Sequence, residues 1–261
     1  MNAWAFIKRD FRIEKNYKLD FFLRLAGMFL YLCIFYFMGF WLKKGNIYFG
    51  GTFFLQVFLG IVFANILLIP LNAFSESLRQ EQLYGTMESL FLSSKNNFSL
   101  LFGGVAYPLV YGFLETIIYL GALFFIPLPG EINILFMIPG VVLGLFSMAA
   151  LGIISASFIL AFRRGDPVNF LLNAGLTLLG GVFFPVGILS GWLFKLALIN
   201  PITHSLELIR IGFGFKSSFS WSPMVSVIFL AVFSMVVLPV SFYAFKLAVK
   251  HVEKTGSLDK Y

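Results

Sequence analysis

The stretch "FFPVGILSGWLFKLALINPITHSLELIRIGFGF", from Phe183 to Phe215, decides how this chain folds. It is apolar enough to lie in a membrane, but four residues break it, at Pro185, Gly187, Gly191 and Pro201. Proline removes a backbone donor and glycine weakens a helix, so one straight spanning helix is not expected. Glu207 and Arg210 add two charges near the end of the stretch. The reason for a broken and charged membrane segment must come from the rest of the chain.

The composition indicates that this protein lies mainly in a lipid membrane. The chain has 261 residues, of which 59% are hydrophobic and only 12% are charged, whereas soluble domains carry about 25% charged residues. Apolar runs of about 20 residues cross a hydrocarbon layer of about 30 Å, and such runs leave no room for a separate soluble catalytic domain. Six spans are predicted, at about 21–42, 52–75, 98–126, 133–162, 168–188 and 222–249. The predicted fold class is an all-α polytopic membrane protein.

The basic residues predict how these spans are oriented. Of the 19 lysines and arginines, 14 fall on one side of the six predicted spans. The other five are Lys43, Lys44, Lys195, Arg210 and Lys216. Positive charge accumulates on the cytoplasmic side of membrane proteins, so both termini are expected in the cytoplasm. Orientation and contact with anionic membrane lipids then explain the net charge of +7, and no nucleic-acid partner is predicted.

The N-terminal segment, residues 1–18, is too charged to span a membrane. On a helical wheel Trp4, Ile7 and Phe11 form an apolar arc beside basic residues, which is typical of an amphipathic helix in the membrane interface. A disordered basic tail is the alternative. The run 21–42 that follows is too long for the apolar core of a signal peptide, so we interpret it as a retained first span.

The loop between the second and third predicted spans, Ser75 to Asn97, contains a short amphipathic helix. The second span is expected to continue into this loop as a helix and to stop at Gly85. Thr86 can cap a new helix through its hydroxyl, and Glu88 suits the positive end of the helix dipole. One apolar face of the new helix then holds Met87, Leu90 and Phe91. This helix, about 86–93, either rests on lipid headgroups or docks a cytoplasmic partner.

Two motifs in the chain carry a resemblance to a known family. The segment "LRQEQLYGTMESLFLSS", Leu78 to Ser94, resembles the signature E-x-x-x-G-T-x-E-x-L-x-x-S of type-2 ATP-binding-cassette (ABC) transporter permeases. The segment Phe183 to Arg210 resembles the second signature of that family, F-P-x-x-x-L-P-x-W-L followed by N-P-x-T-x-x-x-x-x-x-R. The order and distance of the motifs and the six spans match, so residues 19–261 are identified as a permease domain. One departure is Ser190-Gly191, which replaces the usual proline-containing turn.

The resemblance implies a homodimer, or a heterodimer with a similar chain, above two copies of an ATP-binding-cassette ATPase subunit. The chain has no Gly-x-x-x-x-Gly-Lys-Ser/Thr phosphate loop. No cofactor is therefore expected in this chain, and ATP and Mg are expected in the partner subunit. By the same resemblance, the helix at 86–93 is the coupling helix, and the turn Arg163 to Pro167 is a smaller contact. The implied ATPase-coupling residues are Glu81, Gly85, Thr86, Met87, Glu88, Leu90 and Phe91.

The resemblance also accounts for the broken segment. It implies two half-helices, Leu189–Ile199 and Ile202–Phe213, that dip into the membrane from outside as a re-entrant hairpin, about 189–213, between the fifth and sixth spans. Asn200-Pro201 suits the tip, because proline restricts the residue before it. We expect this hairpin to form the outer gate, with the residues Pro185, Trp192, Asn200, Pro201, Glu207 and Arg210. Glu207 and Arg210 are expected to pair or to reach lipid headgroups, and an ordinary outer loop with a surface ion pair is the alternative.

Several polar and aromatic residues inside the spans are candidates for lining a pathway. One face of the fifth span holds Asn169, Asn173 and Thr177 at four-residue spacing. The resemblance implies that they line the pathway at a dimer interface, and helix–helix hydrogen bonding at that same interface is the alternative. One face of the first span holds Phe29, Tyr36 and Phe40, for which plain lipid-facing packing is the alternative. Glu115, in the third span, is expected in its protonated form beside a tyrosine or a neighbouring helix, with proton coupling as the alternative.

The chain shows no convergent set of catalytic residues. It has two histidines, His204 and His251, which fall on opposite sides of the membrane in the predicted topology, and a single cysteine, Cys33, which permits no intrachain disulfide. No HExxH motif or Cys/His cluster is present, so neither a metal site nor an enzyme is predicted.

The resemblance implies that the chain exports a hydrophobic or amphipathic substrate, such as a drug, a lipid or a lipid-linked glycan. A prokaryotic plasma (inner) membrane is the expected location. The alternative function is an ion-gradient-driven carrier or a channel without an ATPase partner. Carriers of that kind usually show internal repeats and several charges at the membrane midplane, which this sequence does not.

Overall fold

The computed structural model describes residues 51–83, 97–121, 128–162 and 166–255 of the chain. It also describes seven helical positions in the first apolar run, which are Leu23, Ala26, Gly27, Leu30, Cys33, Ile34 and Phe37. The predicted interfacial helix at 1–18 and the predicted coupling helix at 86–93 lie outside these residues. The aromatic candidates Phe29, Tyr36 and Phe40 also lie outside them.

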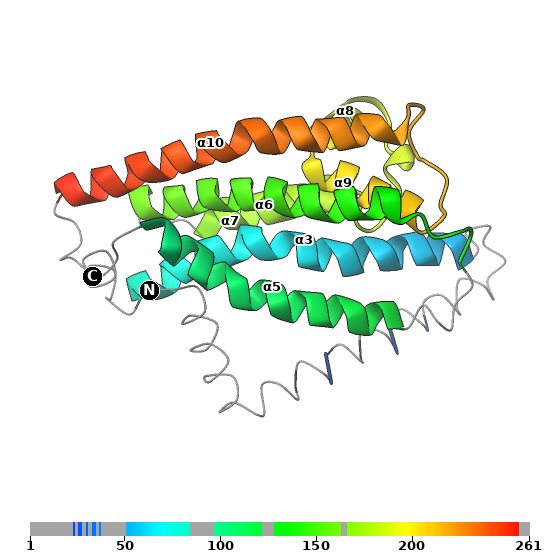
Figure 1. Cartoon of the computed structure of the whole chain (residues 1–261), viewed down its shortest axis with the longest axis horizontal. Coiled ribbons are helices and arrows are strands. Elements are labelled where there is room, and N and C mark those ends of the chain that lie inside the picture. The colour runs from blue at the N-terminus through cyan, green and yellow to red at the C-terminus, as the bar shows by residue number, and fades with distance from the viewer. Residues whose placement is uncertain are drawn as a thin grey trace.

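The described residues form helices and no strand. The elements are α3 (Gly51–Leu83), α5 (Asn97–Gly121), α6 (Ile134–Phe162), α7 (Asp166–Leu179), the 3₁₀-helix η2 (Val186–Ile188), α8 (Gly191–Ile199), α9 (Pro201–Gly212) and α10 (Pro223–Thr255). Figure 1 shows α3, α5, α6 and α10 side by side along the long axis, with α8 and α9 gathered at one end. This agrees with the predicted all-α class.

Three of the described helices are long and apolar enough to cross a membrane. These spans are Phe53–Gln80, Ile134–Ala161 and Pro223–Val252, and shorter apolar helices occupy Val105–Gly121 and Val168–Leu179. The chain is therefore a membrane protein, and the count of six spans stays a prediction. The 33 residues of α3 extend about 50 Å, so α3 continues past a hydrocarbon layer of about 30 Å. This agrees with the prediction that the second span runs on as a helix.

The fifth predicted span is shorter than expected. We expected a span at 168–188, but α7 ends at Leu179. The amide of Gly180 still donates to the carbonyl of Leu176, and Gly181 then turns the chain with φ of 70°. A left-handed φ of this kind suits glycine and not residues with a Cβ. The Gly180-Gly181 pair therefore ends the helix early.

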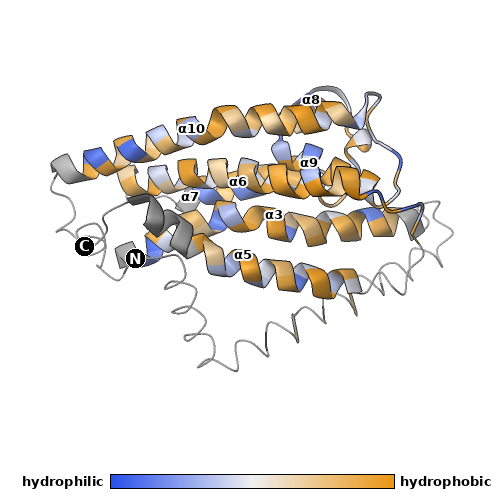
Figure 2. Cartoon of the chain, viewed as in Figure 1, coloured by the Kyte–Doolittle hydropathy of each residue, from blue (hydrophilic) through white to orange (hydrophobic). Residues whose placement is uncertain are grey.

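Burial in this fold differs from that of a soluble protein, because large apolar side chains lie on the outside as well as in the core. Large apolar side chains point outward along α10, where Met235 is 79% exposed, and Figure 2 shows the long helices as mainly hydrophobic. Serines lie inside instead. The hydroxyls of Ser147 on α6 and Ser234 on α10 are 3.0 Å apart and buried. Polar side chains join helices in this way where lipid covers the outside.

The helix α3 lies at the centre of the bundle. It contacts α5, α6, α7 and α9. In its most apolar stretch of 18 residues, 67% are buried, compared with 28% for the corresponding stretch of α6 and 22% for that of α10. A glycine allows the closest approach to α6, because a Cβ at Gly152 would lie 2.6 Å from the carbonyl oxygen of Pro70 and 2.9 Å from Cα of Leu71. Any displacement of α3 would therefore have to be accommodated at its contacts with four other described helices.

Candidate functional site

The broken segment forms two helices of different character. The break falls at Asn200-Pro201 as predicted, although α8 begins at Gly191 and α9 at Pro201, so both bounds differ slightly from expectation. Of the twelve residues in α9, eleven are buried, whereas Ala197 is the buried residue of α8. The polar sequence of α9 is thus enclosed by protein, while α8 lies on the surface of the described bundle.

Asn200 joins α8, α9 and α7. Its side-chain oxygen accepts a hydrogen bond of 3.0 Å from the amide of Ile202 and so caps α9. Its side-chain nitrogen donates to the carbonyl of Leu176 at 2.9 Å, and the hydroxyl of Thr203 donates to the carbonyl of Leu179 at 3.3 Å. The last carbonyls of a helix have no partner within it. The start of α9 therefore supplies donors to the end of α7.

Arg210 is the central side chain of this site. It is 3% exposed, and its Nε and Nη2 atoms donate to the carbonyl of Gln56 on α3 at 3.2 and 3.0 Å. Nη2 also donates to the carbonyl of Gly181 at 2.7 Å. A Cβ at Gly60 would lie 2.7 Å from Nη2 and overlap the carbonyl oxygen of Val182. Gly60 thus leaves room for the guanidinium, which ties together α3, the end of α7 and α9.

Glu207 points inward as well and holds the loop after α9. It is 3% exposed and accepts hydrogen bonds from the hydroxyl of Ser217, at 3.0 Å, and from the amide of Ser218. We expected Glu207 and Arg210 to pair with each other or to reach lipid headgroups. Both expectations are wrong for this structure, because both side chains are buried and each bonds to other groups. The alternative of a surface ion pair fails for the same reason.

His204 is a member of this cluster that the sequence did not single out as a site residue. It is 3% exposed, with Nδ1 3.0 Å from the hydroxyl of Ser226 on α10 and Nε2 2.9 Å from the carbonyl of Leu198 on α8. Its ring stacks on Phe229, with ring centroids 4.1 Å apart. No sequence signal could reveal this role, because the partners lie on other helices.

Two predicted gate residues lie apart from the buried cluster. Trp192 is 68% exposed in the first turn of α8. Pro185 precedes η2, and its carbonyl accepts from the amide of Ile188 at 3.1 Å. At Ser190-Gly191, where the sequence departs from the family signature, Gly191 begins α8 with a positive φ of 62°. The structure therefore brings Asn200, Glu207 and Arg210 together in one buried region and leaves Trp192 on its surface.

The polar stripe of α7 bonds to α3. The side-chain nitrogen of Asn173 donates to the side-chain oxygen of Asn72 at 2.6 Å, and that of Asn169 donates to the same oxygen at 3.2 Å. The hydroxyl of Ser155 on α6 donates to Asn169 at 3.4 Å. For Asn169 and Asn173, these contacts are hydrogen bonds between helices of one chain, whereas both expected roles placed the two residues at a dimer interface. Nothing in the spacing of polar residues along the chain predicts Asn72 as their partner.

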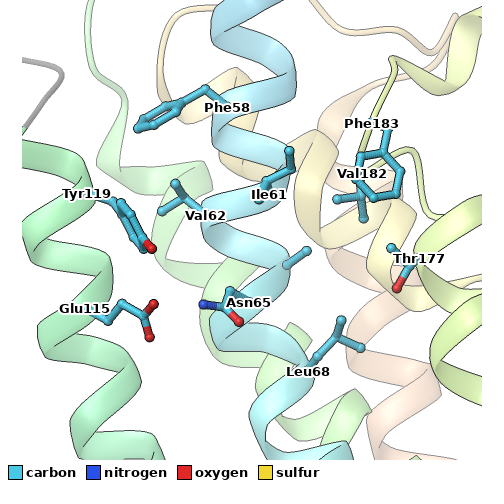
Figure 3. Close-up of a pocket in the computed structure, with 11 residues that line it drawn as sticks. Phe58, Ile61, Val62, Asn65, Leu68, Glu115, Tyr119, Thr177, Val182 and Phe183 are labelled. Atoms are coloured by element: carbon cyan, nitrogen blue, oxygen red, sulfur yellow. The ribbon is translucent and has the colours of Figure 1, made fainter. Parts of the chain in front are cut away.

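Thr177, the third residue of the stripe, lines a cavity of about 400 Å³. Figure 3 shows Glu115 and Tyr119 reaching from α5 toward α3, with Asn65 on α3 facing the same space and Thr177 on the opposite side of α3. The remaining wall is apolar and includes Phe58 and Phe183. The cavity thus combines one carboxyl group, amide and hydroxyl groups, and aromatic rings.

Of the seven predicted ATPase-coupling residues, the structure describes one. Glu81 lies in the last turn of α3, and the other six, Gly85, Thr86, Met87, Glu88, Leu90 and Phe91, lie outside the described residues. Within the described residues, no group of three His, Cys, Asp or Glu side chains could hold a metal ion. The site therefore consists of a buried polar cluster and a cavity, joined by α3.

The chain matches the family described as ABC-2 type transporter over residues 1–214. The protein therefore belongs to the ABC-2 type transporters and is the membrane component, or permease subunit, of such a transporter. Membership of this family implies an ATP-binding-cassette partner in general. No curated protein matches the chain.

Proposed function

We propose that this permease exports a hydrophobic or amphipathic substrate across the plasma membrane of a prokaryote. Two permease chains, identical or similar, assemble with two ATPase subunits that bind ATP and Mg. Both termini lie in the cytoplasm, as the distribution of basic residues favours. The end of the bundle that carries α8 and α9 then faces outward, and the end of α3 at Leu83 faces the ATPase.

The observation that carries this proposal is the position of α3. This single helix runs from Gly51 to Leu83, and Leu83 lies two residues before Gly85-Thr86, the motif that resembles the family's coupling element. At its other end, the carbonyl of Gln56 accepts both hydrogen bonds from Arg210. One continuous helix thus links the proposed ATPase contact to the buried polar cluster.

This link supports a mechanism in which the nucleotide state moves the outer gate. Displacement of the coupling helix at 86–93 shifts α3 along or about its axis. Since Arg210 is bonded to α3 and to Gly181 together, that shift pulls α9 relative to the end of α7. The bonds of Asn200 and Thr203 to α7 close this junction in the resting state and separate when the gate opens.

The experiment is to purify the chain with its ATPase subunit and to measure ATP hydrolysis. Met87→Asp, Leu90→Asp and Phe91→Asp each place a charge on the proposed docking face. We expect each to reduce association and stimulated hydrolysis about tenfold, because burying an unpaired carboxylate in an apolar contact is unfavourable. Ser89→Asp places the same charge on the opposite face of the helix and serves as the matched control.

Two results would contradict the proposal. One is normal association and ATP-driven transport in all three docking-face variants. The other is transport by the purified chain in liposomes under an ion gradient, with no ATPase subunit present. The second result would favour the alternative function of an ion-gradient-driven carrier or a channel.

A further inference from the structure

The cavity beside α3 has a chemical character that narrows the substrate class. Its volume of about 400 Å³ lies in the range of about 300 to 1,000 Å³ that holds small organic ligands. Asn65, on its wall, falls near the middle of the span Phe53–Gln80. The cavity therefore lies at the depth of the hydrocarbon core. A polar wall at this depth marks a functional site by default, because ionisable groups there are unfavourable unless they are used.

Glu115 gives the cavity a carboxyl group that can become negatively charged when a cation binds beside it. Among the described residues that line it, Glu115 is the one acidic or basic side chain, and Tyr119 is the other titratable one. Glu115 is half-buried and reaches from α5 toward Asn65 (Figure 3). A carboxylate offers about four acceptor positions, so a contact with the protein leaves positions for a ligand. An approaching cation also favours the ionised form of a carboxyl group.

The aromatic wall favours the same kind of ligand. Phe58 and Tyr119 line the cavity on the side of Glu115, and Phe183 lines it on the opposite side of α3 (Figure 3), where it is 48% exposed. The faces of aromatic rings attract cations, most strongly where water is excluded. The apolar area of these rings and of Val62 accommodates a hydrophobic body at the same time. The carboxyl group and the apolar walls of the cavity together therefore favour an amphiphilic ligand.

The described walls contain no group that would bind an anion. No lysine or arginine lines the described part of the cavity, so a phosphate or diphosphate group would find no positively charged partner among these walls. Burying a charged group without such a partner is unfavourable. A substrate attached to lipid through a diphosphate therefore fits this cavity poorly.

We infer that this cavity binds a cationic amphiphile, with the positive group beside Glu115 and the hydrophobic body against Phe58 and Phe183. The inference rests on the proposed function and narrows its substrate from amphiphiles in general to those carrying an amine or a fixed positive charge. Asn65 and Thr177 position polar substituents of the same ligand. Entry from the lipid phase matches the location of the cavity within the hydrophobic part of the bundle.

The test uses two probes of nearly equal size and shape but opposite charge, tetraphenylphosphonium and tetraphenylborate. The full-length chain is purified in detergent without its ATPase, and binding of radiolabelled tetraphenylphosphonium is measured by equilibrium dialysis. We expect saturable binding that tetraphenylborate does not compete for. Glu115→Gln should raise the dissociation constant about tenfold, the loss expected for one charge-assisted contact. Glu131→Gln, which removes an exposed carboxylate outside the cavity, should leave it unchanged.

A second measurement avoids any loss of folding in the variant. A hydrophobic carbodiimide is added to the wild-type chain, and modification of Glu115 is followed by mass spectrometry. Tetraphenylphosphonium should slow this modification, and tetraphenylborate should not. The inference is overturned if the wild type binds no tetraphenylphosphonium, if Glu115→Gln binds it as tightly, or if both probes protect equally. These results leave the ATPase association untouched, so they are distinguishable from a failure of the proposed function.

Discussion

Arg210 donates two hydrogen bonds to the backbone carbonyl of Gln56, although 154 residues separate the two along the chain. The same guanidinium bonds to the carbonyl of Gly181. One buried side chain therefore joins α9 to the start of α3 and to the turn after α7. Arginine suits this task, because its planar fork can address two acceptors at once, which the single ammonium group of lysine does less well.

Arg210→Met should destabilise the protein strongly. It keeps much of the side-chain volume but removes three charge-assisted hydrogen bonds and leaves Glu207 as a buried acid without the nearby positive charge. We expect the free energy of unfolding to fall by about 3 kcal/mol or more, measured by thermal unfolding of the purified chain in detergent. Lys216→Met removes an exposed cation from the following loop and should change stability by less than about 0.5 kcal/mol. Equal effects of the two variants would argue against the role of Arg210.

Gly60→Val should separate α3 from the turn after α7. The added Cβ would overlap the carbonyl oxygen of Val182 and press on Nη2 of Arg210, so the backbone must move. Overpacking of this kind costs about 1 to 3 kcal/mol, and we expect stimulated ATP hydrolysis to fall as well, because the link between α3 and α9 is disturbed.

The control for Gly60 is Gly175→Ala on α7. Nothing lies within 4 Å of a Cβ added at Gly175, so alanine should be neutral or stabilise the helix by about 0.5 kcal/mol. If Gly60→Val unfolds at the same temperature as the wild type and shows normal stimulated ATP hydrolysis, the close approach at Gly60 does not contribute to the link between α3 and α9.

The break of the segment at Asn200-Pro201 was predictable, since a proline and its preceding residue have restricted backbone geometry. The orientation of α9 was not. Residues such as Thr203, Glu207 and Arg210 lead one to expect a helix face in contact with water or headgroups. Their partners are backbone carbonyls and hydroxyls of other elements, and backbone groups leave no signal in the sequence. Hence the two charged residues were identified as site residues, but with the wrong contacts.

The early end of α7 has a similar explanation. The apolar run continues beyond Leu179, so hydropathy alone extended the predicted span to 188. The decisive feature is the positive φ of Gly181, and glycine in an apolar run is compatible with both a helix and a turn. The stripe of Asn169 and Asn173 was predicted from its spacing, but the spacing could not distinguish a pathway from a helix contact.

Asn72 and Asn173 should show energetic coupling in a double-mutant cycle. Asn72 accepts hydrogen bonds from both Asn169 and Asn173, so Asn72→Ala removes both contacts and Asn173→Ala one of them. Hydrogen bonds between membrane helices contribute about 0.6 kcal/mol on average and up to about 1.7 kcal/mol. We expect a coupling energy of about 1 kcal/mol from thermal unfolding of the four proteins. Strict additivity would mean that these side chains do not interact energetically, and it would contradict their role in holding the two helices together.

Cysteines at Ile199 and Thr203 should report the movement of the junction between α9 and α7. Ile199 is 66% exposed and Thr203 is 1% exposed, so in the resting state Ile199→Cys should react with an external thiol reagent and Thr203→Cys should not. If ATP binding separates α9 from the end of α7, the reactivity of Thr203→Cys should rise about tenfold or more, while that of Ile199→Cys should change little. Both variants are made in a Cys33→Ser background, and labelling is measured by mass spectrometry with and without ATP. A Thr203→Cys side chain that stays unreactive in every nucleotide state, in a complex that still transports, would show that the α9–α7 junction does not open during export.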